Sequence, residues 1–347
     1  MLKKIISILI LTITTVIVSA QDYYTTIDIL KPGCLVFPSS VSNVLVVNNA
    51  VNQPHDYGHQ SHLAGQVRST TIVDTDSAVL YFLSTFTKSL EEQEFFDNVD
   101  LLEKSQNHSG QYFQQHSITS LQADHLRKMY DADALIVLNR LMLSDLVEDF
   151  MTDADDYYAS LEVRCVSIWH IFMPNGGQPQ SLTLADTLVW ENRDLRRSDA
   201  INNLPNRRDA LLDMSIYSAE ETAKKIIPHW EQRDRYFYKH SDRRMKAGID
   251  SLYHKKWDAA INEWYNAYQQ GNNKLKARAA ANIAATFEIE GDINSALYWA
   301  QQAAEHFNNH DFFGNEQRLY ENMVLYANEL SARLEDEKLL YQQSRKQ

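Results

Sequence analysis

The strongest constraint on the fold is an internal repeat in the last third of the chain. Small residues recur there at a spacing of 36, in the pairs Gly248 with Ala284, Ala260 with Ala296, and Ala267 with Ala303. Two antiparallel helices approach closely only where their contact positions carry side chains this small, and large residues such as Trp257 and Trp264 then fill the surrounding space. The pattern therefore predicts two consecutive helix–turn–helix units over residues 242–307.

This repeat resembles the tetratricopeptide repeat, a helix–turn–helix unit of about 34 residues. The additional residues fit the Gly271-Asn272-Asn273 linker, and Gly291-Asp292 stands where that family turns between its helices. A third helix is expected over residues 315–343, because apolar side chains follow one another there at intervals of three and four. This helix would cap an array that is shorter than the three units usually needed for a continuous core.

The resemblance implies a groove that binds a protein segment. The inward positions are largely apolar, which suits a helix or an apolar peptide rather than a peptide carboxylate. The residues expected to line the groove are Met245, Ile249, Leu252, Tyr253, Ala281, Asn282, Ala285 and Ile289. In the alternative interpretation, the capping helix or the N-terminal domain fills this groove from within the chain.

The preceding part of the chain is expected to be an α/β (or α+β) domain with a mixed sheet. The expected strands are residues 41–47, 134–138, 159–172 and 181–192, and the expected helices are residues 75–95 and 121–130. The nearly pure apolar run 134–138 is typical of a strand that is buried on both faces. Alternation of strands and helices in this order predicts helices packed against the sheet.

The sequence thus divides into four parts. They are a signal peptide (1–20), the α/β domain (21–217), a connecting helix (218–241) and the tetratricopeptide-like repeats with their C-terminal capping helix (242–347). The connecting helix is expected to start with a capping box made by Ser218 and Glu221. Pro228 is expected to bend or interrupt it, because proline lacks the amide hydrogen that a helix needs.

The first twenty residues have the features of a secretory signal. Lys3 and Lys4 precede an apolar run that ends in the small-residue cleavage site Val18-Ser19-Ala20. No later segment is apolar for long enough to cross a membrane. A lipid anchor is not expected, because Cys34 follows Lys31-Pro32-Gly33 instead of a Leu-small-small box. We expect a periplasmic or envelope-associated mature chain that begins at Gln21.

A further resemblance rests on residues 29–32, Phe37-Pro38 and the run Val44-Leu45-Val46-Val47-Asn48-Asn49. These residues are similar to the opening of an uncharacterised family of exported Bacteroidota proteins, many of which have a lipid anchor and a tetratricopeptide-like end. The similarity extends through Asp133-Ala134-Leu135 and residues 228–236. It implies export and a two-part architecture, and it assigns no functional residue.

Charge and motifs limit the possible functions. The 46 acidic residues exceed the 33 basic ones, and a formal net charge of −13 disfavours nucleic-acid binding. The sequence has no phosphate-binding glycine loop, no nucleophile elbow and no catalytic cysteine motif. We therefore expect a non-enzymatic adaptor without a cofactor, which binds a protein partner in the cell envelope. The alternative is an envelope enzyme that acts on glycan or peptide through an unrecognised site.

Two weaker patterns suggest metal ions. His55, His59 and His62 lie close enough in sequence to ligate zinc or copper, and this loop is the second alternative function. Acidic residues crowd the segment 145–156, but the glycine and the final glutamate of an EF-hand are missing. A solvated hairpin tip is the other interpretation of this acidic segment, and arginines of residues 193–208 are expected to pair with neighbouring aspartates.

Cys34 and Cys165 are the two cysteines of the chain. Export would place them in an oxidising compartment, where a single disulfide between them is chemically possible. The alternative is two free thiols, since residues 161–172 form a strand-like run in which a buried Cys165 is natural.

Export predicts that the mature protein begins at Gln21, either with a free amino group or with this glutamine cyclised. Mass spectrometry of the protein recovered from a Gram-negative periplasm should show a mass that lacks residues 1–20. Ala20→Tyr should block cleavage, because the cleavage site requires small residues. Recovery of the native sequence at its full length would contradict the prediction.

Overall fold

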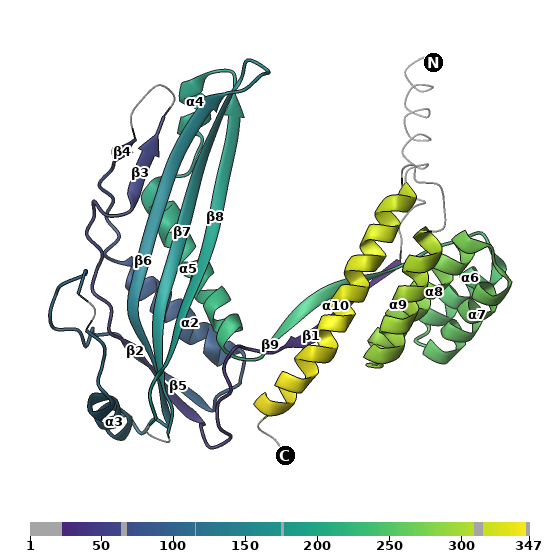
Figure 1. The fold of residues 1–347 in the computed structure, drawn as a ribbon, viewed down its shortest axis with the longest axis horizontal. Coiled ribbons are helices and arrows are strands. Elements are labelled where there is room, and N and C mark those ends of the chain that lie inside the picture. Colours follow the sequence, from purple (N-terminus) through teal and green to yellow (C-terminus); the bar gives the residue numbers. More distant parts are fainter. Residues whose placement is uncertain (1–22, 64–67, 115, 175–176, 309–314, 345–347) are drawn as a thin grey trace, which may run out of the picture. The chain divides into compact units, whose positions relative to one another are not determined.

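The computed structural model describes residues 23–63, 68–114, 116–174, 177–308 and 315–344. The predicted signal peptide and its cleavage site lie outside these residues, as do Asn175 and Gly176 of a predicted turn. The chain divides into two compact units (Figure 1). Residues 32–229 and the chain end from Gln342 form the α/β unit, and residues 23–31 with 230–341 form the helical unit.

The α/β unit is built on a seven-stranded mixed sheet. Its strands are β2 (Asn43–Asn48), β3 (His59–His62), β4 (Ser69–Thr70), β5 (Asn98–Leu102), β6 (Ala134–Met151), β7 (Tyr157–Phe172) and β8 (Gln180–Asp194). The order β4-β3-β6-β2-β5 includes parallel pairs of β2 with β5 and with β6, and β7 continues the sheet antiparallel from β6 to β8. The expected mixed sheet followed by a helical region is confirmed.

Helices cover both faces of the parallel part of the sheet (Figure 1). The helices α2 (Ala78–Glu92) and α5 (Arg207–Ile226) pack on the face of the sheet to which Val44 points. The helix α3 (Ser120–Met129) packs on the opposite face, to which Leu45 points. Successive strand residues point to opposite faces, so burial on both sides requires the continuous apolar run of β2. The chain crosses from β2 to β5 through α2, and from β5 to β6 through α3.

A β-bulge at Asn139 divides β6 into two parts. The pairing with β7 passes from Leu138 opposite Trp169 to Arg140 opposite Ile168. Before the bulge, the even-numbered residues 134, 136 and 138 belong to the larger core of the α/β unit. After the bulge, the odd-numbered residues Leu141, Leu143 and Val147 belong to it. The extra residue therefore reverses which side chains of β6 face this core.

The segment after α5 differs from the expected connecting helix over residues 218–241. The helix α5 ends at Ile226, and the strand β9 (His229–Phe237) comes next. Pro228 explains the change, because proline disfavours helical geometry at the residue before it, and Ile227 is extended with φ −120° and ψ 161°. The proline therefore ends the helix and starts a strand.

The predicted capping box of Ser218 and Glu221 is also wrong. Both residues lie inside α5, whose first turn is capped by the Asn206 side chain, which accepts a hydrogen bond from the Arg208 amide. Ser218 is buried, and its hydroxyl donates to the Asp186 carboxylate on β8. This serine fixes the helix to the sheet, and the short helix α4 (Arg197–Asn202) precedes α5.

The helical unit contains a two-stranded ribbon of β1 (Tyr23–Lys31) and β9. Thr26 contacts Asp234 and Asp28 contacts Gln232, which shows that the two strands run antiparallel. Neither strand is expected from the sequence, because buried residues such as Ile29 and Phe237 stand among polar or exposed ones and form no continuous apolar run. The remainder of the unit consists of α6 (Arg243–Tyr253), α7 (Trp257–Gln270), α8 (Asn273–Ile289), α9 (Ile293–Asn308) and α10 (Asn315–Gln343).

Two consecutive helix pairs, α6 with α7 and α8 with α9, coincide with the 36-residue repeat. All six small residues of the repeat are buried. Gly248 is the most constrained of them, because a β-carbon at this position would lie 2.2 Å from Nε1 of Trp264, whose indole donates to the Met245 carbonyl. Within the described residues, none of the helices is sufficiently long and apolar to traverse a bilayer.

We expect Gly248→Ala to lower the free energy of unfolding of the helical unit by about 1–3 kcal/mol, the usual cost of overpacking a core. Urea unfolding followed by tryptophan fluorescence measures this change. Lys246→Ala, at an exposed position of the same helix, is the matched control and should stay within about 0.5 kcal/mol of the native protein. Equal stability of the two variants would contradict the packing described for Trp264.

Candidate functional site

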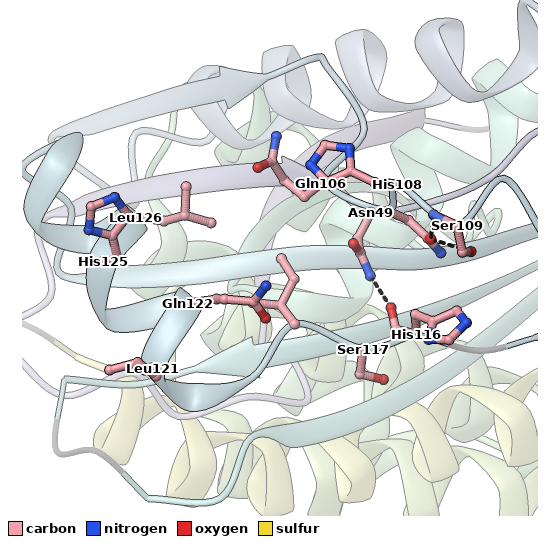
Figure 2. A pocket seen from close by; sticks show the side chains of 12 residues that line it. Asn49, Gln106, His108, Ser109, His116, Ser117, Leu121, Gln122, His125 and Leu126 are labelled. Atoms are coloured by element: carbon pink, nitrogen blue, oxygen red, sulfur yellow. Dashed lines mark hydrogen bonds between the residues drawn. The ribbon is translucent and has the colours of Figure 1, made fainter.

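A crevice of about 720 Å³ lies at the carboxyl ends of the parallel strands in the α/β unit (Figure 2). Its lining comes from the end of β2, from the loop after β5 and from α3. The lining residues are Asn49, Gln106, Asn107, His108, Ser109, His116, Ser117, Ile118, Leu121, Gln122, His125 and Leu126. In open α/β sheets, ligands bind outside the carboxyl ends of the strands where the connections diverge, and β2 stands at such a point between β5 and β6.

Two asparagines at the end of β2 fix the loop that forms one wall. Asn48 donates a hydrogen bond to the Glu103 carbonyl (2.8 Å). Asn49 donates to the His116 carbonyl at 2.7 Å, as the dashed line in Figure 2 shows, and to Oδ1 of Asn139 at 2.9 Å. Buried side-chain amides thus hold an irregular segment across the strand ends, where it has no ladder partner of its own.

The bulge of β6 supplies a small inner recess that adjoins this crevice. Its volume is about 10 Å³, and it shares Asn107, His116 and Ser117 with the crevice. Asn139 lines the recess, and its Nδ2 is buried without a hydrogen-bond partner in the described structure. Such an unpaired amide is costly unless a water or a ligand oxygen accepts its hydrogens, and the recess has room for about one such atom.

Positive charge near the crevice comes from Arg140 and from the N-terminal end of α3. No carboxylate is found among the described residues that line the crevice or the recess, whereas Arg140 and three histidines do line them. Arg140 donates to the Tyr112 carbonyl at 2.7 Å and stacks over the Tyr112 ring. The first turn of α3, with its capping box of Thr119 and Gln122, adds the positive end of the helix dipole.

Sequence reasoning missed this crevice because its residues come from three separate segments. The available signal was the pair Asn48-Asn49, which directly follows a strand buried on both faces. Polar side chains at that position lie at the ligand-binding edge of a parallel sheet. Nothing local marks His108 and His125 as neighbours, because only the fold of the segment between β5 and α3 brings them to the same crevice.

The structure does not bring His55, His59 and His62 together as one metal site. Strand geometry directs His59 inward to a buried contact with Asp145, while His62 is exposed and contacts Glu148. The group with metal-ligand spacing among the described residues is instead His55 with Asp74 and Asp76, whose ligand atoms lie within 4.8 Å of one another. All three side chains are largely solvent-accessible, and His55 already forms a 3.0 Å contact with Asp76.

The acidic segment and the arginine cluster neutralise one another. Asp145 and Asp149 on β6 are buried, and each contacts an arginine. Arg207 contacts Asp145, and Arg197 makes a bidentate contact with Asp149 at 2.5 and 3.1 Å. These two aspartates do not belong to a solvated tip, because the odd-numbered positions of β6 face inward after the bulge.

The two predictions for this region hold elsewhere in it. Asp153 and Asp155, at the tip between β6 and β7, are exposed. The expected local pairing forms at Arg196, which contacts Asp199.

The described cysteines do not form a disulfide. Cys34 is exposed and Cys165 is buried in β7, and both are free thiols. Burial raises the pKa of Cys165 to about 12, so this thiol stays protonated and unreactive. The alternative of two free thiols is the one that the structure supports.

The predicted groove of the helical unit is largely closed. Tyr253 is exposed, Ile249 and Ile289 are half-buried, and the other predicted residues, Met245, Leu252, Ala281, Asn282 and Ala285, are buried. The β1–β9 ribbon covers the first part, because Tyr23 makes an edge-to-face contact with Tyr253, with ring centroids 4.5 Å apart, and Phe237 joins the core of Met245. Only Ala281 and Ala285 of the predicted set line a remaining cavity, which has a volume of about 370 Å³.

Fold and site define a two-part protein, with a ligand-sized crevice in an α/β unit and a second unit made of helices. Residues 41–238 match a family described as Domain of unknown function (DUF8603), and residues 246–332 match Domain of unknown function (DUF6340). The first match covers more than half of the chain, which therefore belongs to the DUF8603 family. The crevice lies entirely within this match. No curated protein matches the chain.

The contact of His55 predicts a measurable titration. The hydrogen bond with Asp76 raises the pKa of His55, so the folded imidazole should titrate above its usual value of about 6.5. Below the pKa that His55 has in the unfolded chain, the contact contributes its full stabilisation to the fold. This stabilisation is lost as the pH rises through the higher pKa that His55 has in the folded protein. NMR titration of the imidazole resonances measures the value.

Asp76→Asn should return the pKa of His55 toward its usual value. Asp74→Asn is the matched comparison and should have a smaller effect, because its carboxylate lies 3.7 Å away instead of 3.0 Å. A native His55 that titrates at or below 6.5 would show that the contact with Asp76 does not form in solution.

Proposed function

We propose that this chain is an exported, non-enzymatic interaction protein of the bacterial cell envelope, whose helical unit binds an extended segment of a partner protein. The observation that carries the proposal is how α8 holds a segment of its own chain. Asn282 accepts a hydrogen bond from the Tyr238 amide (2.7 Å) and donates one to the Tyr238 carbonyl (3.0 Å). A helix face that binds extended backbone in this way suits a further extended peptide.

The cavity of about 370 Å³ lies beside this contact and gives such a peptide an anchoring place. Its lining combines small and apolar residues of α8 and α10 with polar residues of β9 and α10. These residues are Asp234, Arg235, Tyr236, Tyr238, Ala281, Ala285, Asn322, Met323, Leu325, Tyr326 and Glu329. Its lining is about equally polar and apolar, which suits a peptide that offers both backbone groups and side chains, and this volume accepts one or two side chains.

A buried ion-pair network fixes the walls of the cavity. Arg235 of β9 contacts Glu288 of α8 at 2.6 Å and Glu329 of α10 at 2.7 Å. Glu288 also accepts hydrogen bonds from Arg333 and from the Tyr326 hydroxyl. Charges paired on all sides hold three elements in one arrangement, so a partner segment would meet a preformed site and lose less entropy on binding.

The finer parts of the proposal rest on the sequence. The 36-residue spacing of small residues, all of which are buried, favours a tetratricopeptide-like array. The features of residues 1–20 favour export with cleavage between Ala20 and Gln21, and the resemblance at residues 29–49 favours a Bacteroidota origin. A peptide-binding module in the envelope is the function that unites these features.

A photoreactive side chain at the cavity tests the proposal. The bait is residues 21–347 with p-benzoylphenylalanine in place of Leu325, which is exposed and lines the cavity. Irradiation in an envelope lysate should give a cross-link to one linear peptide of a partner, identified by mass spectrometry. Leu325→Glu should weaken capture of the same partner at least tenfold, because a buried carboxylate would be left unpaired.

Tyr298→Glu is the matched control, since Tyr298 is exposed on α9 and does not line the cavity. Capture by this variant should equal capture by the native chain. A partner that binds Leu325→Glu as well as the native chain, or a cross-link spread over unrelated peptides, would exclude the cavity as a partner site.

A further inference from the structure

We propose that the crevice of the α/β unit binds a small anionic molecule, with a phosphate or carboxylate group on a body the size of a sugar. The inference is independent of the proposed partner binding, because it rests on residues 49–140 alone. Its volume of about 720 Å³ falls in the range of small-molecule sites. No function that we have assigned above uses this crevice.

The chemistry of the lining favours an anion. The described lining has no carboxylate, the group that best accepts hydrogen bonds from the hydroxyls of a neutral sugar. The side-chain oxygens of Asn107 and Gln122 already accept hydrogen bonds from Ser109 and Thr119, so their NH2 groups remain as donors. The imidazoles of His108 and His125 can each donate one further hydrogen bond, and Arg140 lines the adjoining recess. Donors of this kind pair best with a ligand that carries negative charge.

The unpaired amide of Asn139 also points to a ligand. This side chain is 8% exposed, its Oδ1 is taken by Asn49, and its Nδ2 has no partner in the described structure. A β-bulge places the residue at the end of β2, and bulges of this kind direct a side chain toward a site. An oxygen atom of the ligand, or a water bound between them, would satisfy the amide.

Apolar side chains form another wall of the crevice. Ile118 and Leu126 form part of the floor, and Leu121 is 81% exposed at the first turn of α3, beside the opening. Exposed large apolar side chains at the edge of a polar crevice are suited to contact with the carbon body of a ligand. The ligand would thus place its anionic group toward the donors and its body against α3 (Figure 2).

Binding should be measured by calorimetry with residues 21–347. The probes are glucose 6-phosphate and glucuronate, which separate a phosphate from a carboxylate requirement, together with inorganic phosphate and neutral glucose. We expect saturable binding of at least one of the two sugar anions and none of glucose. The anion that binds more tightly identifies the group that the crevice recognises.

Leu121→Asp is the decisive variant. A carboxylate in the first turn of a helix favours the helix dipole, so this exposed substitution should leave folding intact. It should weaken binding of the sugar anion at least tenfold, through like charge at the opening. Met129→Asp, at an exposed position of α3 outside the crevice, is the control and should bind as the native chain does.

Three results would overturn the proposal. They are no saturable binding of either sugar anion at millimolar concentration, binding of glucose equal to that of the anions, and unchanged binding by Leu121→Asp. Competition between inorganic phosphate and glucose 6-phosphate would support the proposal that the hydrogen-bond donors of the crevice bind the anionic group. Cross-linking at Leu325 is read separately, so either proposal can fail while the other stands.

Discussion

The α/β unit depends on the pairing of β6 with its neighbours. This one strand shares an edge with both β2 and β3, and its other edge pairs with β7 along nearly its whole length. Asp145 and Asp149 of β6 are buried and bind the arginines at the starts of α5 and α4. Because a buried carboxylate is tolerated only with a partner, these ion pairs fix where both helices begin. The strand β6 therefore determines where the other strands of the sheet, the helices α4 and α5 and the crevice lie.

The parts of the fold that could be predicted are those in which local pattern and final burial agree. The apolar run 134–138 is buried on both faces, and the small residues of the repeat lie at helix contacts. Elements that depend on distant partners carry no such signal. The buried residues of the β1–β9 ribbon, such as Ile29 and Phe237, form no continuous apolar run, and its pairing joins two segments that are far apart in the sequence. Pro228 predicts an interruption of the helix, but the strand after it forms only because β1 pairs with it.

Site prediction failed for a related physical reason. Proximity in sequence suggests His55, His59 and His62, yet extended backbone turns neighbouring side chains to opposite faces and separates them. The family analogy suggests Met245 and Leu252, which the ribbon covers. Residues of the crevice come together only through the crossover connections, which no single segment encodes.

The bulge at Asn139 also limits how such a chain can change over evolution. Deleting this residue would remove the amide from the recess beside the crevice and at the same time shift the remainder of β6 by one position, which would expose Leu141 and Leu143 and turn Arg140 and Ser144 inward. A substitution at position 139 changes only the recess, whereas a shorter strand also loses the core. We therefore expect relatives that had lost the ligand to keep the spacing between Leu138 and Leu141.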